Sequence, residues 1–154
     1  MFATETQVRV RYAETDQMGV VYHANYATYF EVARTESIRR LGFTYRELEA
    51  MGVEMPVVEI AMRYHRAAHY DDLLTIHTEV RQLPERQTME FHHRILNEKG
   101  KLITSGNVTL FFIDKATKKR TRMPAEMLDR IRPFYSQPSN EGTSSTDEPL
   151  HDSD

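Results

Sequence analysis

Apolar or small side chains recur every three or four residues between positions 24 and 41, which is the spacing of one face of an α-helix. The stripe consists of Tyr26, Tyr29, Phe30, Ala33, Ser37, Ile38 and Leu41. No proline or glycine interrupts this segment, and Gly42 follows it where a glycine commonly ends a helix. The pattern predicts a helix of about five turns, residues 24–41, with the stripe facing the core.

On both sides of this helix, apolar and polar residues alternate, which indicates half-buried strands. One alternating segment precedes the helix, at 7–12, and four follow it, at 58–65, 74–80, 89–95 and 102–113. The residues Asn97–Gly100 between the last two segments have the composition of a hairpin turn. Consecutive strands joined by such a turn favour an antiparallel sheet.

Two shorter helices are predicted from their start signals. Thr44 and Glu47 have the spacing of a capping box, which begins a helix that ends at Gly52. Pro124 fits the first position of a last helix, residues 124–132. The segment 65–72, with sequence HRAAHYDD, interrupts the alternation and is interpreted as a connection.

This order of elements predicts an α+β fold, in which the long amphipathic helix buries its stripe on the antiparallel sheet. One helix leaves the other sheet face and the sheet edges uncovered. Pairing between copies of the chain would cover them, so the pattern favours a homo-oligomer.

Composition narrows the class of protein. The 154 residues suit one domain, and there is no cysteine for disulfides, thiolate metal sites or a cysteine nucleophile. The N-terminal residues lack the pattern of a secretory signal, and no apolar run is long enough for a membrane span, so we expect a cytoplasmic protein.

Charge is distributed unevenly along the chain. Residues 136–154 carry five acidic side chains and no Lys or Arg. The net charge of the whole chain is −3, so the net charge of residues 1–135 is +2. A body so weakly basic does not indicate nucleic-acid binding. We predict a folded domain at 1–135 and a disordered tail at 136–154, because the tail is polar, acidic and poor in apolar groups.

The loop before the long helix contains an acid, Asp16, and an imidazole, His23, with Gly19 between them. Backbone N–H groups at a helix start have no intrahelical acceptor and carry the positive end of the helix dipole. A carboxylate beside them suits a reaction in which an oxyanion develops. Taken alone, Asp16 also fits a simple turn residue, and His23 fits a polar residue at a helix start.

The same stretch resembles the signature of the hotdog-fold acyl-CoA thioesterases, and within them the 4-hydroxybenzoyl-CoA thioesterase and YbgC-like branch. The matching positions are Tyr12, Thr15-Asp16, Gly19 to His23, Asn25-Tyr26, Phe30-Glu31 and Ala33-Arg34. The general similarity extends from about Val8 to about Phe134. It implies a sheet of about five strands wrapped around one central helix, and a homodimer or homotetramer.

The resemblance also implies roles for individual residues. Asp16 matches the catalytic carboxylate, which either attacks the thioester or activates the water that does. The N–H of His23 would polarise the thioester carbonyl, and its imidazole would orient water or protonate the leaving thiolate. Tyr12 matches a further catalytic position, although it also fits an aromatic residue packed at a strand end. The implied substrate-binding positions of the motif are Gly19, Val21 and Tyr22.

Basic groups for the phosphates of coenzyme A are expected first from Arg63, His65 and Arg66, because the strand after the second helix often lines the coenzyme site in this family. Lys101 and the run 115–122 are further candidates. For each of them, a solvated surface position is the plain alternative.

A metal site is the main competing interpretation of the histidines. His65 and His69 are four residues apart, with Asp71 and Asp72 nearby, a spacing that would present both imidazoles to one ion on a helix. The alternation before His65 predicts a strand instead, so we expect no metal. Coenzyme A enters as part of the substrate, so no separate cofactor is expected.

The sequence therefore favours a hydrolase of short- or medium-chain acyl-CoA or aryl-CoA thioesters. A hotdog protein that binds an acyl ligand or a partner without catalysis is the alternative, and acyl carrier protein is a second possible carrier of the acyl group. Asp16 favours the enzyme, because a protein that only binds has no need of an acid at this position.

Overall fold

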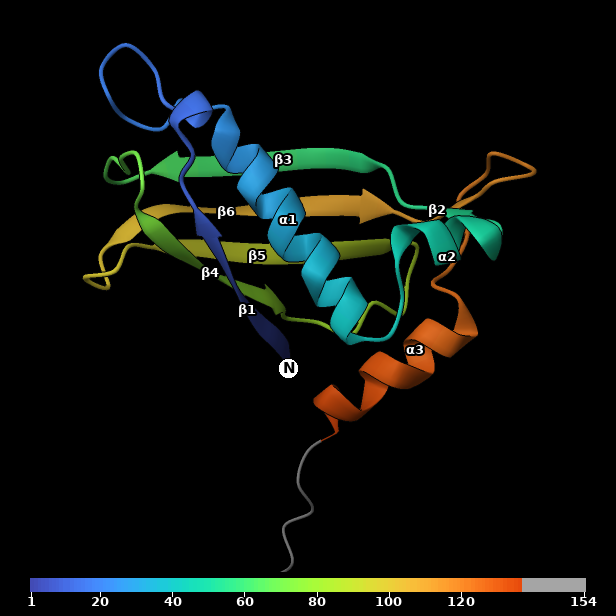
Figure 1. Cartoon of the computed structure of the whole chain (residues 1–154). Coiled ribbons are helices and arrows are strands. Elements are labelled where there is room, and N and C mark those ends of the chain that lie inside the picture. The colour runs from blue at the N-terminus through green and yellow to red at the C-terminus, as the bar shows by residue number, and fades with distance from the viewer. Residues whose placement is uncertain (137–154) are drawn as a thin grey trace, which may run out of the picture.

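Five strands form one antiparallel sheet, and the long helix α1 lies across one face of it (Figure 1). The structure is a computed structural model that describes residues 1–136. In chain order the elements are β1 (Phe2–Arg9), a 3₁₀ helix (Tyr12–Glu14), α1 (Asn25–Arg40), α2 (Tyr45–Ala50), β2 (Val53–Glu54), β3 (Val57–Tyr64), β4 (Leu73–Val80), β5 (Thr88–Leu96), β6 (Leu102–Phe111), β7 (Ile113–Asp114), α3 (Ala125–Ile131) and a second 3₁₀ helix (Arg132–Tyr135).

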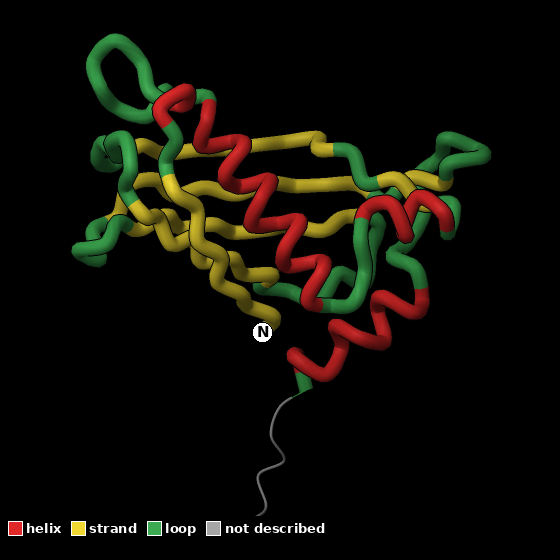
Figure 2. Tube along the Cα trace, in the orientation of Figure 1, coloured by secondary structure: helices red, strands yellow, loops and turns green. Residues whose placement is uncertain are grey.

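The strands follow the order β1-β4-β5-β6-β3, and β2 pairs with β7 in a small second sheet. Figure 2 shows the long helix over the strands of the main sheet, with the two shorter helices at one end. The predicted α+β class, with an antiparallel sheet of five strands and one central helix, is confirmed. The predicted tail lies outside the described residues, apart from Ser136.

The long helix is confirmed to within one residue at each end, with Ala24 and Leu41 as its caps. All seven residues of the predicted stripe are buried. The helix packs closely on the sheet at Gly106, where an added Cβ atom would lie 3.0 Å from Cε2 of Phe30 and 2.1 Å from the carbonyl oxygen of Ala61. Glycine at this position lets Phe30 and β3 approach β6.

The first strand differs from its prediction. The strand was expected at 7–12, whereas β1 begins at Phe2 and ends at Arg9. Its inward positions include Thr4 and Thr6, and threonines at inward positions hide the alternation of apolar residues. Beyond Arg9 the chain turns into a 3₁₀ helix, so Tyr12 does not end a strand. Tyr12 is 78% exposed.

The other sequence signals hold with small changes of boundary. Thr44 and Glu47 form the expected capping box of α2, and Gly100 has φ of 73° in the hairpin turn. The fifth predicted strand is divided at Phe112 into β6 and β7. The last helix starts one residue late, because Pro124 is its N-cap.

Strand β3 is an edge of the sheet and is mostly exposed on both faces. The alternation in its sequence predicted one buried face, but none of its residues is buried within this chain. Its exposed large apolar side chains are Val57, Val58, Ile60 and Tyr64. An exposed, apolar edge strand is a ready template for pairing with another strand.

Candidate active site

The loop that carries Asp16 is a tight hairpin between the first 3₁₀ helix and α1. Thr15 and Val21 form an antiparallel bridge across it, and the amide of Asp16 donates to the carbonyl of Val20 at 2.9 Å. Gly19 has φ of 79°, a conformation that glycine adopts without steric cost. In Figure 1 this hairpin projects from the body of the molecule just before α1 begins.

The carboxylate of Asp16 takes part in its own turn. One oxygen, Oδ1, accepts the N–H of Met18 at 2.9 Å. The amide of Gly19 donates to the carbonyl of Asp16 at 3.0 Å. Asp16 thus has the structural role of a turn residue that the sequence allowed. The hydrogen bonds of its own loop fix its position.

The start of α1 presents backbone donors to solvent. Ala24 is the N-cap and supplies no side-chain cap. Within residues 1–136, the amides of His23 and Ala24 donate no hydrogen bond, and both residues are exposed. Such free N–H groups at the positive end of a helix dipole form a site for an anion or a developing oxyanion.

Aromatic rings surround His23. Its ring centroid lies 4.6 Å from that of Tyr22 and 6.1 Å from that of Tyr64. The hydroxyl of Tyr64 donates to the carbonyl of His23 at 3.4 Å, and its ring lies 5.8 Å from that of Tyr26. The sequence predicted no role for Tyr64. It did place Tyr64 with the apolar residues of β3, on the face of the sheet that the helix covers.

The remaining motif residues have different surroundings. Val21 is buried and its amide donates to the carbonyl of Ala68 at 2.8 Å, which anchors the hairpin to the connection 65–72. Tyr22 is exposed. The ring of Tyr12 packs edge-on against Tyr70, with centroids 5.8 Å apart. Within the described residues no hydrogen bond joins the hydroxyl of Tyr12 to Asp16 or His23.

The basic candidates Arg63, His65 and Arg66 have partners on β6. Arg63 is opposite Ser105 in the pairing of β3 with β6, and Nε2 of His65 lies 2.8 Å from Oγ of Ser105. Side chains alternate along a strand, so both lie on the sheet face opposite to that of Tyr64, which faces α1. Arg66 donates to the carbonyl of Leu102 at 3.4 Å.

The two histidines of the metal alternative have separate partners. His65 contacts Ser105, whereas Nδ1 of His69 lies 3.8 Å from Asp72. In the described part of the chain, no group of three or more His, Asp or Glu side chains is arranged to hold a metal ion.

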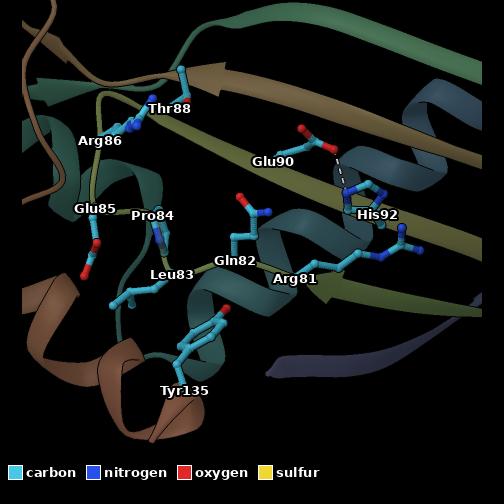
Figure 3. Close-up of a pocket in the computed structure, with 10 residues that line it drawn as sticks. All are labelled: Arg81, Gln82, Leu83, Pro84, Glu85, Arg86, Thr88, Glu90, His92 and Tyr135. Atoms are coloured by element: carbon cyan, nitrogen blue, oxygen red, sulfur yellow. Dashed lines mark ion pairs between the residues drawn. The ribbon is translucent and has the colours of Figure 1, made fainter.

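A hollow in the described part of the chain lies away from the hairpin. Its volume is about 960 Å³, and Figure 3 shows its lining, which comes from the β4–β5 connection, the first half of β5 and Tyr135. The ionisable lining residues are Arg81, Glu85, Arg86, Glu90 and His92. β5 begins in this hollow, whereas the connection 65–72 and the hairpin lie at the other end of the sheet (Figure 1). We therefore base the functional argument on the hairpin and not on this hollow.

Comparison with known proteins shows the family of the chain. The model of the thioesterase-like superfamily matches residues 10–131, and the chain belongs to this family. YneP of Bacillus subtilis is 40% identical over 119 residues, which are 77% of this chain and 86% of YneP. YbgC of Haemophilus influenzae, an acyl-CoA thioesterase, is 37% identical over 121 residues, which are 78% of this chain and 88% of YbgC.

A solved structure supports the fold and the family. A DHNA-CoA thioesterase from Staphylococcus aureus superposes with a TM-score of 0.75 at 39% identity, over 88% of this chain and 87% of that one. The fold is the hotdog fold, and the chain is an acyl-CoA thioester hydrolase by family. No helix within residues 1–136 has the length and apolar content to cross a bilayer.

Proposed function

We propose that this protein hydrolyses the thioester of short- or medium-chain acyl-CoA, or of aryl-CoA, to the free acid and coenzyme A. One observation carries the proposal. Asp16 lies on a hydrogen-bonded hairpin directly before a helix start whose exposed His23 amide has no acceptor within residues 1–136. A carboxylate can act as nucleophile or base in thioester hydrolysis, and a free N–H can stabilise the oxyanion that develops.

The roles follow from the chemistry of each group. The N–H of His23 receives the oxygen of the thioester carbonyl as negative charge develops on it; the loss of one such donor typically costs about 10²–10³ in rate. The carboxylate of Asp16 either attacks the carbonyl carbon or removes a proton from the attacking water. The imidazole of His23 orients the attacking water or donates a proton, taken up from solvent, to the thiolate that leaves as the C–S bond breaks.

The exposed edge of β3 supports a dimer in which each site is shared between two chains. Two copies of β3 that pair antiparallel would continue the sheet across the interface and cover the apolar side chains of the strand. Tyr64, at the end of β3, contacts His23, so the interface would border the site.

The same pairing of two β3 strands suggests a second group of residues that could bind the phosphates of coenzyme A. β3 begins next to β2, which pairs with β7, and it ends at Tyr64. In an antiparallel pair the start of one β3 lies beside the end of the other. The turn after β7 and the Asp16 hairpin lie at opposite ends of β3 (Figure 1), so this turn of the second chain would reach the site. It contains the basic residues Lys115, Lys118, Lys119, Arg120 and Arg122.

Two basic groups are therefore candidates for the phosphates. The first, Arg63, His65 and Arg66, belongs to the same chain as Asp16 and adjoins Tyr64. The second is the basic run 115–122 of another copy. Both would bind the nucleotide end of coenzyme A, far along the pantetheine arm from the thioester.

A hydrolysis screen tests the function. The purified protein is assayed with coenzyme A thioesters of increasing acyl length, with aryl thioesters, and with the same acyl groups on acyl carrier protein, and free thiol is measured. We expect turnover on a subset of the coenzyme A esters. Binding of these esters without release of thiol would instead support the non-catalytic alternative, and turnover only on carrier-protein esters would change the substrate class.

A further inference from the structure

The carboxylate of Glu14, two residues before Asp16, joins the start of the hairpin to the second turn of α1. Its Oε1 accepts the amide of Arg11 at 2.8 Å and the hydroxyl of Tyr29 at 3.0 Å. Its Oε2 accepts the guanidinium of Arg11 at 3.0 Å. The side chain of Glu14 is only 12% exposed, whereas that of Arg11 is 77% exposed.

The backbone carbonyl of Glu14 is held as well. It accepts the amide of Tyr22 at 2.9 Å and the side-chain amide of Asn25 at 2.8 Å. Tyr22 is on the returning arm of the hairpin, and Asn25 is the first residue of α1. Glu14 thus accepts hydrogen bonds through both its carboxylate and its carbonyl, from the hairpin and from the helix.

These contacts favour an ionised Glu14. Partial burial opposes the charge, but hydrogen bonds from the amide and guanidinium of Arg11 and from Tyr29 together lower the pKa of Glu14. Burial raises the pKa of Tyr29, and its bond to Glu14 adds to this effect. A charged carboxylate therefore accepts from a neutral hydroxyl, which is a stronger bond than one between neutral groups.

We propose that Glu14 is a positioning residue for the reaction: together with Arg11, Asn25 and Tyr29 it forms a clasp that fixes the Asp16 hairpin against the start of α1. The clasp sets the distance between the carboxylate of Asp16 and the N–H of His23. This inference rests on the proposed function, in which these two groups act on one thioester.

The position of the clasp explains why it would affect the rate. Asp16 lies on the hairpin, and the His23 amide lies where the hairpin joins the helix. The hairpin is bonded internally and touches the connection 65–72 through Val21, so its placement relative to α1 depends on its base, where Glu14 and Tyr22 are. A displacement of about 1 Å between reacting groups can cost about 10²-fold in rate, even when the change is far from the chemistry.

Two substitutions test the clasp with little change of shape. Tyr29→Phe removes only the hydroxyl that donates to Glu14, and Glu14→Gln removes the charge but keeps the size. We expect kcat to fall about 10-fold or more in each, with KM within about twofold. The double variant should be no worse than Glu14→Gln alone, because both changes open the same contact.

The matched control is Glu36→Gln. Glu36 is also on α1 and pairs with Arg39 at 3.3 Å, but both side chains are exposed. This variant should keep the kcat of the unchanged protein.

Amide hydrogen exchange separates positioning from general loss of stability. In both clasp variants the amides of residues 15–22 should exchange faster, while those of β4 and β5 keep their protection. Unchanged kcat in both variants would overturn the proposal. So would faster exchange throughout β4 and β5, because the lost activity would then reflect unfolding of the whole domain.

Asp16→Asn is measured beside them. If that variant keeps full turnover, the proposed catalytic role fails, and the exchange of residues 15–22 still shows whether the clasp holds the hairpin. If Asp16→Asn is inactive and the clasp variants are fully active, the clasp alone is refuted.

Discussion

At the scale of single residues, Asp16 shows that a structural and a chemical role can share one side chain. Its Oδ1 accepts the amide of Met18, so the residue shapes its own turn. This turn also fixes the position of the carboxylate on the hairpin before His23. The choice of Asp at this position is explained by the turn alone, and only the helix start next to it indicates chemistry.

His93 is a residue whose environment the sequence did not reveal. It lies on the inward face of β5 and is buried, and its ring stacks on Phe30 with centroids 4.5 Å apart. Nδ1 lies 2.9 Å from Oγ1 of Thr78, and Nε2 has no partner within the described residues. Burial lowers the pKa of His93 to about 3, and the charges of Arg34 and His92 act in the same direction.

This pKa makes stability depend on pH. Below about pH 6.5 the unfolded chain binds a proton at His93 that the folded chain does not bind until about pH 3. The free energy of unfolding contributed by His93 is therefore complete above pH 6.5 and falls as the pH is lowered. Between pH 7.5 and pH 5 we expect a loss of about 2 kcal/mol.

Urea denaturation at the two pH values measures this loss. His93→Gln is the comparison, because it removes the titrating group and leaves every other acid and base in place. The pH dependence should be smaller by about 2 kcal/mol in the variant. An equal pH dependence in both proteins would show that His93 titrates normally.

At the scale of helices and strands, the sequence correctly predicted the features that depend on local periodicity. The stripe of α1 was correct at every position because one helix face meets one sheet. β1 was placed wrongly because threonines occupy inward positions where apolar residues were sought. β2 was missed and β7 was merged with β6 into one predicted strand, since two-residue strands leave no periodic signal.

The candidate site was predictable only in part. Asp16, Gly19 and His23 lie in one continuous stretch, so their proximity follows from the sequence. The contact of Tyr64 with His23 joins residues 41 positions apart, and the bond of Tyr29 to Glu14 depends on how the helix docks on the hairpin. Local patterns carry no information on such contacts.

The basic residues at the end of β3 and directly after it allow a first test of coenzyme binding. Arg63→Ala and Arg66→Ala should raise KM for coenzyme A thioesters more than they lower kcat. A contact with a remote phosphate is equally strong in the ground and transition states, so its loss weakens binding without slowing the chemical step. Steady-state kinetics on one coenzyme A ester measures both constants.

An N-acetylcysteamine ester of the same acyl group is the control, because it lacks the nucleotide. The two variants should then differ little from the unchanged protein. Equal losses on both esters would show that the arginines are structural, and the phosphate site would then be sought at Lys101 or the run 115–122.

At the scale of the whole molecule, one chain leaves its own sheet unfinished. Within residues 1–136, β3 has a free edge and several exposed apolar side chains, and Tyr64 at its end contacts His23. We expect a homodimer or homotetramer of the 18.0 kDa chain, with each site bordered by two chains. Light scattering of the purified protein gives its mass directly.

Ile60→Glu tests where the chains meet. It places a charge among the exposed apolar residues of β3, so the oligomer should dissociate and turnover should fall. Val32→Glu is the matched control, because Val32 is an exposed aliphatic residue on α1 and its change should leave mass and turnover unaltered. An active monomer, in either the unchanged protein or Ile60→Glu, would rule out a shared site.

The most direct measurement of the whole account is the turnover of Asp16→Asn on a coenzyme A thioester that the unchanged protein hydrolyses. Asparagine keeps the size of the side chain and the oxygen that accepts the Met18 amide, so the hairpin and the melting temperature should be preserved. It is neither a nucleophile nor a base, so turnover should disappear while the ester still binds. Full turnover by a folded Asp16→Asn variant would contradict the assignment of this site.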